Sequence, residues 1–115
     1  MKVRRFDIWL ADLQPRRGTE AGKVRPVLIV QTDLLNDVHP STIICPITTN
    51  VIPDTEPLRV QLKPGRTGLR IRSDIMIDQL RAIDNRRLIE RIGRIGKAAQ
   101  RSVKQDLLAI LDLRP

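Results

Sequence analysis

The segment "GKVRPVLIVQ", residues 22–31, contains the clearest β-strand of the sequence. Its unbroken apolar run, residues 27–30, is typical of a buried β-strand. Arg25 and Pro26 stand just before that run. Proline cannot donate to a strand ladder, so Pro26 is expected near a strand end, on an edge or at a bulge. Arg25 is then either a solvated charge where a loop meets a strand or a guanidinium clamp for an anion such as phosphate.

The segments on either side predict more strands. In residues 6–13, apolar and polar side chains alternate imperfectly. Residues 41–48 form a second apolar run, which contains Pro46. In residues 57–65, apolar and polar side chains alternate up to a Pro-Gly turn. Residues 74–83 predict at least one further strand, whereas residues 86–96 fit either a helical turn or a short strand. Residues 32–40 predict a short helical turn with Thr32 as its N-cap and Pro40 as its stop. Residues 14–23, punctuated by proline and glycine, predict an exposed, mobile loop.

The C-terminal segment predicts an amphipathic helix. Its apolar stripe consists of Ala99, Val103, Leu107, Ile110 and Leu111. This helix packs either on its own domain or on a second copy of it. Short strands followed by one helix indicate a mostly β fold, a small SH3-like β-barrel with a C-terminal α-helix, as one domain over residues 1–115.

The composition favours an anionic partner. The chain carries a formal net charge of +8, which suits nucleic acid, an acidic protein segment or a membrane surface. Residues 31–58 contain no Lys or Arg, whereas seven lie between residues 86 and 104. Aromatic side chains make up 2% of the chain, so an RNA reader of this composition depends on Arg, Lys and polar groups rather than on base stacking.

Several function classes lose support from the sequence. The chain contains no P-loop, GxGxxG, paired CxxC, HExxH or GxSxG motif. One cysteine and one histidine cannot build a tetrahedral zinc site without acidic ligands, and Cys45 is expected to be a small buried hydrophobe. No metal and no cofactor are therefore expected. The chain lacks a signal peptide and an apolar run of the roughly 18–20 residues that span a bilayer, which predicts a cytoplasmic location and no membrane partner.

A second candidate position closes the 41–48 strand. Thr48 begins "TTN", residues 48–50. A threonine at a strand end either satisfies local backbone groups or donates a hydrogen bond to a charged oxygen of a ligand. The sequence alone leaves both alternatives open, as it does for Arg25.

Five segments together resemble one family. "DIWLADL", a glycine-containing loop, "GKVRPVLIVQTD", "TIICPITTN" and "DQLRAIDNRRL", in that order, are similar to the MazF/PemK family of toxin endoribonucleases, and the similarity extends from about residue 7 to residue 113. The resemblance implies an SH3-like barrel, usually a homodimer. It implies cleavage of single-stranded RNA, and an antitoxin partner whose flexible acidic segment covers the RNA groove.

The resemblance also implies roles for particular residues. Arg25 and Thr48 match the catalytic positions. The loop before Arg25 corresponds to a mobile segment that gates the site. The implied RNA-binding positions are Glu20, Lys23, Thr49, Asp78, Gln79 and Arg81. Some relatives carry an arginine at the position of Met76, so no mechanism that requires that arginine is expected here.

The implied chemistry is attack of a ribose 2′-OH on its own phosphodiester, which yields a 2′,3′-cyclic phosphate and a 5′-OH. Arg25 and Thr48 would stabilise charge on the phosphoryl oxygens. His39 has a suitable intrinsic pKa for a general base, but the resemblance does not place it at the site. Two alternatives remain. One is a CcdB-like toxin of similar fold that poisons gyrase, and the other is a non-catalytic RNA-binding module.

Overall fold

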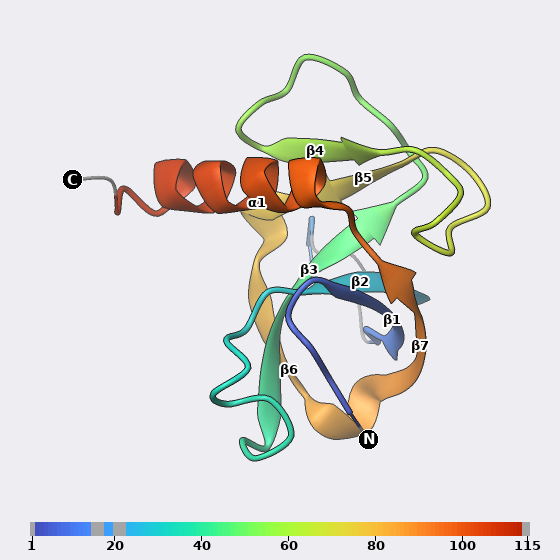
Figure 1. Ribbon diagram of the computed structural model, residues 1–115, viewed down its shortest axis with the longest axis vertical. Helices are drawn as coiled ribbons and strands as arrows, with labels where there is room; N and C mark the ends of the chain where they lie inside the picture. Colours follow the sequence, from blue (N-terminus) through green and yellow to red (C-terminus); the bar gives the residue numbers. More distant parts are fainter. Residues whose placement is uncertain (1, 15–17, 20–22, 114–115) are drawn as a thin grey trace.

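In the computed structural model, which describes residues 2–14, 18–19 and 23–113, the strands form one curled antiparallel sheet (Figure 1). The elements of the described residues are β1 (Asp7–Asp12), β2 (Val24–Ile29), β3 (Ser41–Thr48), β4 (Arg59–Leu62), β5 (Ser73–Met76), the 3-10 turn η1 (Ile77–Gln79), β6 (Arg81–Asp84), the 3-10 turn η2 (Asn85–Arg87), β7 (Leu88–Arg94) and α1 (Lys97–Ile110). The strand order is β4-β5-β3-β2-β1-β7, and β6 also pairs with β3. The predicted mostly β fold with a C-terminal helix is confirmed.

Both strand prolines lie where the ladder does not need their missing N–H. Pro26 pairs with Leu10 of β1, but the ladder between β2 and β3 begins only at Val27. Pro46 lies where β3 changes partner, from β6, which pairs as far as Ile44, to β5, which pairs from Ile47. The prolines therefore mark the place where the sheet divides into two parts.

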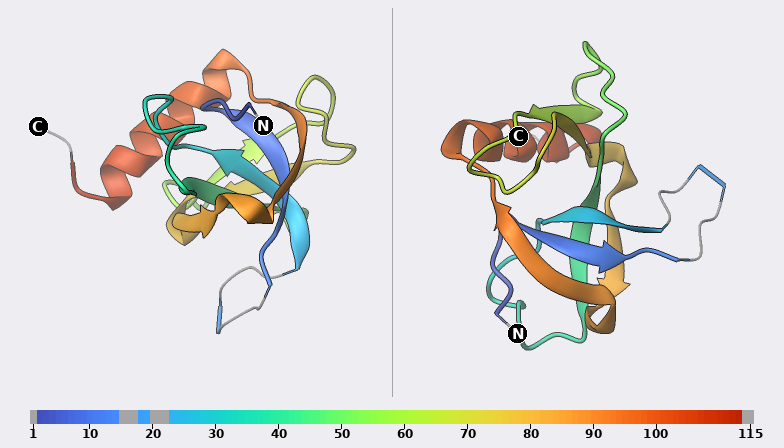
Figure 2. Two further views of the ribbon diagram at one scale, coloured as in Figure 1. Left: turned by 90° about the horizontal axis from the view of Figure 1, so that it is seen from below. Right: turned by 90° about the vertical axis from the view of Figure 1, so that its right-hand side faces the viewer.

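Side chains on the two faces of the sheet form two separate cores. The helix-side core contains Ile8, Leu28, Cys45, Ile47, Ile75 and Val103 among others, and α1 covers it (Figure 2). The barrel core lies within the curl of the sheet and consists of Val3, Trp9, Ala11, Leu13, Val27, Ile29, Ile44, Met76, Ile83 and Leu88. Alternate residues of β1, β2 and β3 thus enter different cores, which explains why both faces of these strands are apolar.

The structure specifies three of the predicted segments further. Residues 74–83, predicted to hold at least one strand, contain part of β5, then η1 and most of β6, because the chain leaves the β4 side of the sheet and joins the opposite end of β3. The ambiguous segment, residues 86–96, is mainly the strand β7. Residues 33–38 form the predicted short turn segment, in which Asn36 N–H donates to Thr32 O and His39 N–H donates to Leu35 O as in helical turns. Thr32 Oγ1 accepts from Leu34 N–H at 3.3 Å, in keeping with its predicted capping role.

The C-terminal helix follows four of the five positions of its predicted stripe. Val103 is fully buried, and Ala99, Leu107 and Ile110 pack partly buried against the helix-side core. The fifth residue, Leu111, is exposed, because it caps the end of α1 and lies beyond the core. Within the described part of the chain, we find no helix with the length and apolar character needed to cross a membrane.

Candidate active site

The pairing register brings Arg25 and Thr48 together. In the ladder between β2 and β3, Val27 pairs with Pro46, and the same register continued by two residues places Arg25 opposite Thr48. The ladder itself ends at Val27 and Pro46, two residues before this pair. Arg25 and Thr48 therefore flank the point where β2 and β3 part.

Their side chains point to the same face of the sheet. Val27 and Ile44 both belong to the barrel core. Arg25 lies two residues before Val27 in β2, and Thr48 lies four residues after Ile44 in β3. Side chains alternate between faces along a strand, so Arg25 and Thr48 share that face. Both are half-buried, which leaves part of each accessible to a ligand. A guanidinium beside a hydroxyl offers several hydrogen-bond donors to one anionic oxygen group.

The local structure at Thr48 turns the chain out of the sheet. Thr48 Oγ1 accepts a hydrogen bond from Asn50 N–H at 3.1 Å. A hydroxyl that accepts from the backbone still has its own proton to donate. The two roles that the sequence left open for Thr48, local backbone bonding and donation to a ligand, are thus compatible.

Two charged residues near Thr48 were not predicted as site residues. Asp74 of β5 pairs directly with Thr48 across the ladder and is fully buried. Arg59 of β4 forms an ion pair with Asp74 at 3.1 Å. The one sequence signal was an acidic residue directly before the apolar run of residues 75–77, which the strand prediction passed over.

The loop between β1 and β2 is fastened at its described parts. Leu13 N–H donates to Lys23 O at 2.9 Å, and Lys23 adopts a left-handed backbone with φ +66°. Gln79 Nε2 donates to Thr19 O at 3.1 Å, which links η1 to this loop. Lys23 thus lies two residues before Arg25, and Gln79 contacts the loop that leads to it. Glu20, the other predicted residue of the loop, lies outside the described residues.

The remaining predicted RNA-binding residues are spread around Thr48. Thr49 is exposed and follows it directly. Arg81 is half-buried and pairs with Ile44, four residues back along β3 and on the barrel-core face. Asp78 is exposed and lies in η1, directly before Gln79.

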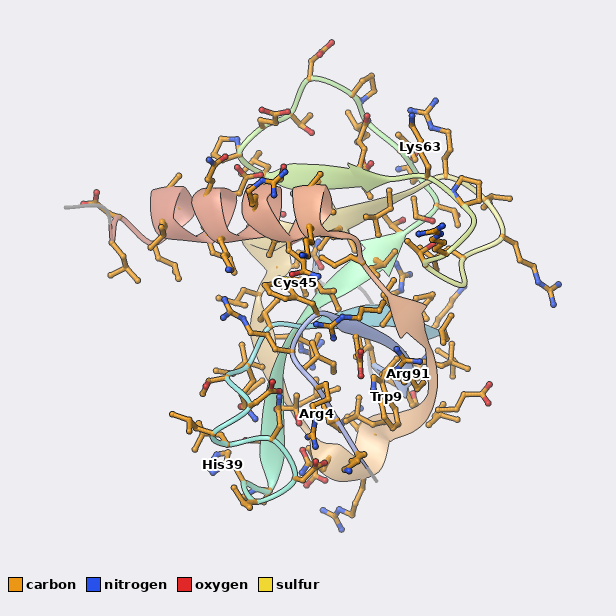
Figure 3. All side chains as sticks on the ribbon, viewed as in Figure 1. Arg4, Trp9, His39, Cys45, Lys63 and Arg91 are labelled. Carbon is orange, nitrogen blue, oxygen red and sulfur yellow. The ribbon has the colours of Figure 1, made fainter. Side chains whose placement is uncertain are left out.

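His39 lies at the wrong end of β3 to act with Thr48. Its backbone carbonyl accepts from Asn85 Nδ2 at 2.7 Å, next to Ser41 where β3 begins. Seven residues of strand, about 23 Å at 3.3 Å per residue, separate that end from Thr48. Figure 3 shows His39 on the turn segment far from β4 and β5. A general-base role for His39 is therefore wrong for this site.

Cys45 has the predicted structural role. It is fully buried in the helix-side core. Burial, with a smaller contribution from the Asp78 charge, raises the pKa of its thiol to about 12. The thiol is therefore protonated at neutral pH and unsuited to nucleophilic chemistry. Within residues 2–14, 18–19 and 23–113, the structure has no group of three or more His, Cys, Asp or Glu side chains placed to hold a metal ion.

Comparisons with known proteins agree on one family. Residues 4–111 match the family described as PemK-like, MazF-like toxin of type II toxin-antitoxin system. The chain is 36% identical to endoribonuclease EndoA of Bacillus subtilis (strain 168), over 97% of this chain and 99% of that protein. It shares its fold with MazF from Deinococcus radiodurans at a TM-score of 0.82, with 23% identity and coverage of 97% and 98%. A MazE–MazF complex from the same organism gives a TM-score of 0.78, with 22% identity and coverage of 99% of each chain.

Proposed function

The chain belongs to the PemK-like, MazF-like toxins of type II toxin–antitoxin systems, and from this premise we propose that it is an endoribonuclease that cuts single-stranded RNA. The phosphodiester that is cut would lie between the side chains of Arg25 and Thr48. The observation that carries the proposal is the shared face and register of these two residues at the point where β2 and β3 part. A phosphodiester placed there meets one cation and one neutral hydroxyl. The CcdB-like alternative does not need this pair of donors, whereas a non-catalytic RNA-binding module could use it to hold a phosphate.

The proposed reaction is an internal transfer within the RNA. The ribose 2′-oxygen forms a bond to phosphorus and loses its proton, while the bond from phosphorus to the 5′-oxygen breaks and that oxygen gains a proton. The products are a 2′,3′-cyclic phosphate and a 5′-OH end. This step is intramolecular, so the protein needs chiefly to hold the chain in line and to stabilise charge.

Arg25 and Thr48 supply that stabilisation. The guanidinium donates two parallel N–H bonds to the phosphoryl oxygens, and the Thr48 hydroxyl donates a third. Arginine does not give up its proton at neutral pH, so Arg25 does not act as the base. The flanking residues Lys23, Thr49, Gln79 and Arg81, together with Glu20 and Asp78 from the sequence analysis, are proposed to hold the nucleotides on either side.

We propose the partners on the same basis. The formal net charge of +8 suits both RNA and an antitoxin with an acidic flexible segment, and structures of MazE–MazF complexes share this fold. A homodimer remains a prediction from the family resemblance. The exposed Leu108 and Leu111 of α1 are compatible with a second copy on that helix.

A cleavage assay in EDTA tests the function. The wild-type protein is incubated with a long single-stranded RNA beside Arg25→Ala and Thr48→Ala, and discrete cuts are expected from the wild type alone. Each variant should lose about 10²-fold or more in rate, the scale of removing one oxyanion donor. Thr48→Ser should retain most of the activity, because it keeps the hydroxyl.

The matched control is Arg86→Ala. Arg86 is an exposed arginine whose guanidinium binds Asp84, at the far end of β3 from Thr48, so its removal should leave cutting unchanged. Failure of the wild type to cut any RNA would contradict the proposal. Preserved gyrase inhibition would then favour the CcdB-like alternative, and RNA binding without cutting would favour the non-catalytic module.

A further inference from the structure

Asp74 occupies an unusual place for a carboxylate. It is fully buried within β5, between Ser73 and Ile75, which are also buried, and it pairs with Thr48. Directly paired residues of antiparallel strands project from the same face, with Cβ atoms about 4.5–5.5 Å apart. A buried negative charge therefore lies beside the hydroxyl that we propose to meet a phosphate.

Only one of the two Asp74 carboxylate oxygens accepts hydrogen bonds from the described residues. Oδ2 accepts from Ile52 N–H at 2.9 Å and from Arg59 NH1 at 3.1 Å. Oδ1 is buried and has no hydrogen-bond partner among the described residues. Arg59 therefore supplies the main compensation for the charge, and its side chain is itself only 18% exposed.

Hydrogen bonds connect this pair to the Thr48 hydroxyl. Arg59 NH1 also donates to Asn50 O at 2.8 Å, and Asn50 N–H donates to Thr48 Oγ1 at 3.1 Å. Asp74 holds the same turn a second time through Ile52 N–H. The turn that follows Thr48 is thus fastened to β4 and β5 at Asn50 and at Ile52.

We propose that Asp74 and Arg59 form a positioning pair that orients the Thr48 hydroxyl toward a bound phosphate. Fixing Asn50 N–H against Thr48 Oγ1 occupies one lone pair of the hydroxyl and restricts where its proton can point. Arg59 also neutralises the Asp74 charge, which would otherwise repel the phosphate. The inference rests on the proposed function, since the phosphate belongs to the RNA. Neither residue touches the reacting atoms, so both act through Thr48.

The test is a double-mutant cycle on cleavage of single-stranded RNA. Asp74→Asn keeps the shape of the side chain and removes the charge that holds Arg59. We expect kcat to fall about 10-fold or more with KM changed less than about 3-fold, because orientation of a donor rather than binding is lost. In the Thr48→Ala background, the same substitution should lower kcat by less than about 3-fold, because the residue on which it acts is gone.

Asp84→Asn is the matched control. Asp84 also forms an ion pair with an arginine, but it pairs with Ser41 at the opposite end of β3. Its substitution should leave kcat unchanged. Equal losses from Asp74→Asn in the wild-type and Thr48→Ala backgrounds would overturn the inference, because they would show a general structural effect. If Asp74→Asn does not fold, Arg59→Met replaces it in the cycle, since it removes both NH1 hydrogen bonds, to Asp74 Oδ2 and to Asn50 O, and keeps an unbranched side chain.

A second readout separates this inference from the proposed function. The Thr48 methyl resonance in NMR should shift in Asp74→Asn and stay in place in Asp84→Asn. An unmoved resonance in Asp74→Asn would overturn the positioning role even in a protein that cuts RNA. A wild-type protein that cuts no RNA would contradict the proposed function, and the Asp74–Arg59 pair could then have no effect on catalysis. A shifted Thr48 methyl resonance in Asp74→Asn would still show that Asp74 influences the surroundings of Thr48.

Discussion

At the scale of single residues, Arg25 and Thr48 were each compatible in the sequence with an ordinary surface or backbone role. The β2–β3 ladder ends at Val27 and Pro46, and strand alternation beyond that point places both residues on the barrel-core face, which neither residue reveals alone. Asp74 and Arg59 could not be predicted as neighbours of Thr48, because that link depends on which residues of β3, β4 and β5 pair across the sheet. The sequence holds one hint of it, an acidic residue directly before the apolar run of residues 75–77.

The Cys45 thiol should resist alkylation in the folded protein. Burial raises its pKa to about 12, so little reactive thiolate exists at pH 8 and the reagent has no access. We expect iodoacetamide to label Cys45 at least about 100-fold more slowly than it labels the same chain in guanidinium chloride. Mass spectrometry of timed samples provides the measurement. Equal labelling rates in the two conditions would show that the helix-side core is open at Cys45.

At the scale of elements, periodicity was most informative where one face of an element is covered. The stripe of α1 was predicted because Val103 and its neighbours pack on a single core. Strands that are apolar on both faces gave a weaker pattern, and it left open how many strands residues 74–83 contain. That division depends on β3 pairing with β6 at one end and with β5 at the other, which is a long-range property.

A close approach between β7 and the loop before β5 predicts a sensitive glycine. A Cβ on Gly93 would lie 2.0 Å from Thr67 O, a backbone atom that cannot move aside alone. Gly93→Ala should therefore lower the free energy of unfolding by about 3 kcal/mol. Gly96→Ala is the control, because no atom lies within 4 Å of its Cβ, and its cost as an N-cap change should be about 1 kcal/mol or less. Urea denaturation measures both, and equal costs would contradict the close contact.

Removal of one charge on α1 should stabilise the protein in a pH-dependent way. Burial, and secondarily the nearby Glu56 charge, raises the pKa of Asp106 above its ordinary value of 3.8. The ionised form is therefore disfavoured in the folded state, and its penalty is fully present only above the folded pKa. Asp106→Asn should raise Tm at pH 7 by about 1–3 °C, and the gain should disappear as the pH falls to about 3.

Thermal unfolding of both proteins between pH 3 and pH 8 measures this difference. The advantage of Asp106→Asn should grow as the pH rises through the folded pKa of Asp106 and then level off. An advantage that stays constant down to pH 3 would show that the charge of Asp106 is not its cause.

At the scale of the whole molecule, the sequence predicted the fold class and the family, since five separated segments occur in the family's order. It could not predict which ends of the strands meet. The structure places Arg25, Thr48 and Asp74 on neighbouring strands where the sheet divides, while His39 lies at the other end of β3 (Figure 3). The proposed reaction uses the 2′-OH of the substrate, rather than a protein nucleophile, as the attacking group.

The most direct test of that central claim uses one RNA with a single 2′-deoxyribose at the cut nucleotide. The wild-type protein is incubated in EDTA with this RNA and with the all-ribose RNA, and the product ends are identified by mass spectrometry. If the 2′-OH attacks, the all-ribose RNA should give a 2′,3′-cyclic phosphate and a 5′-OH, and the substituted RNA should not be cut at that position. Cutting of the substituted RNA at the same position, or a 5′-phosphate end, would contradict attack by the 2′-OH.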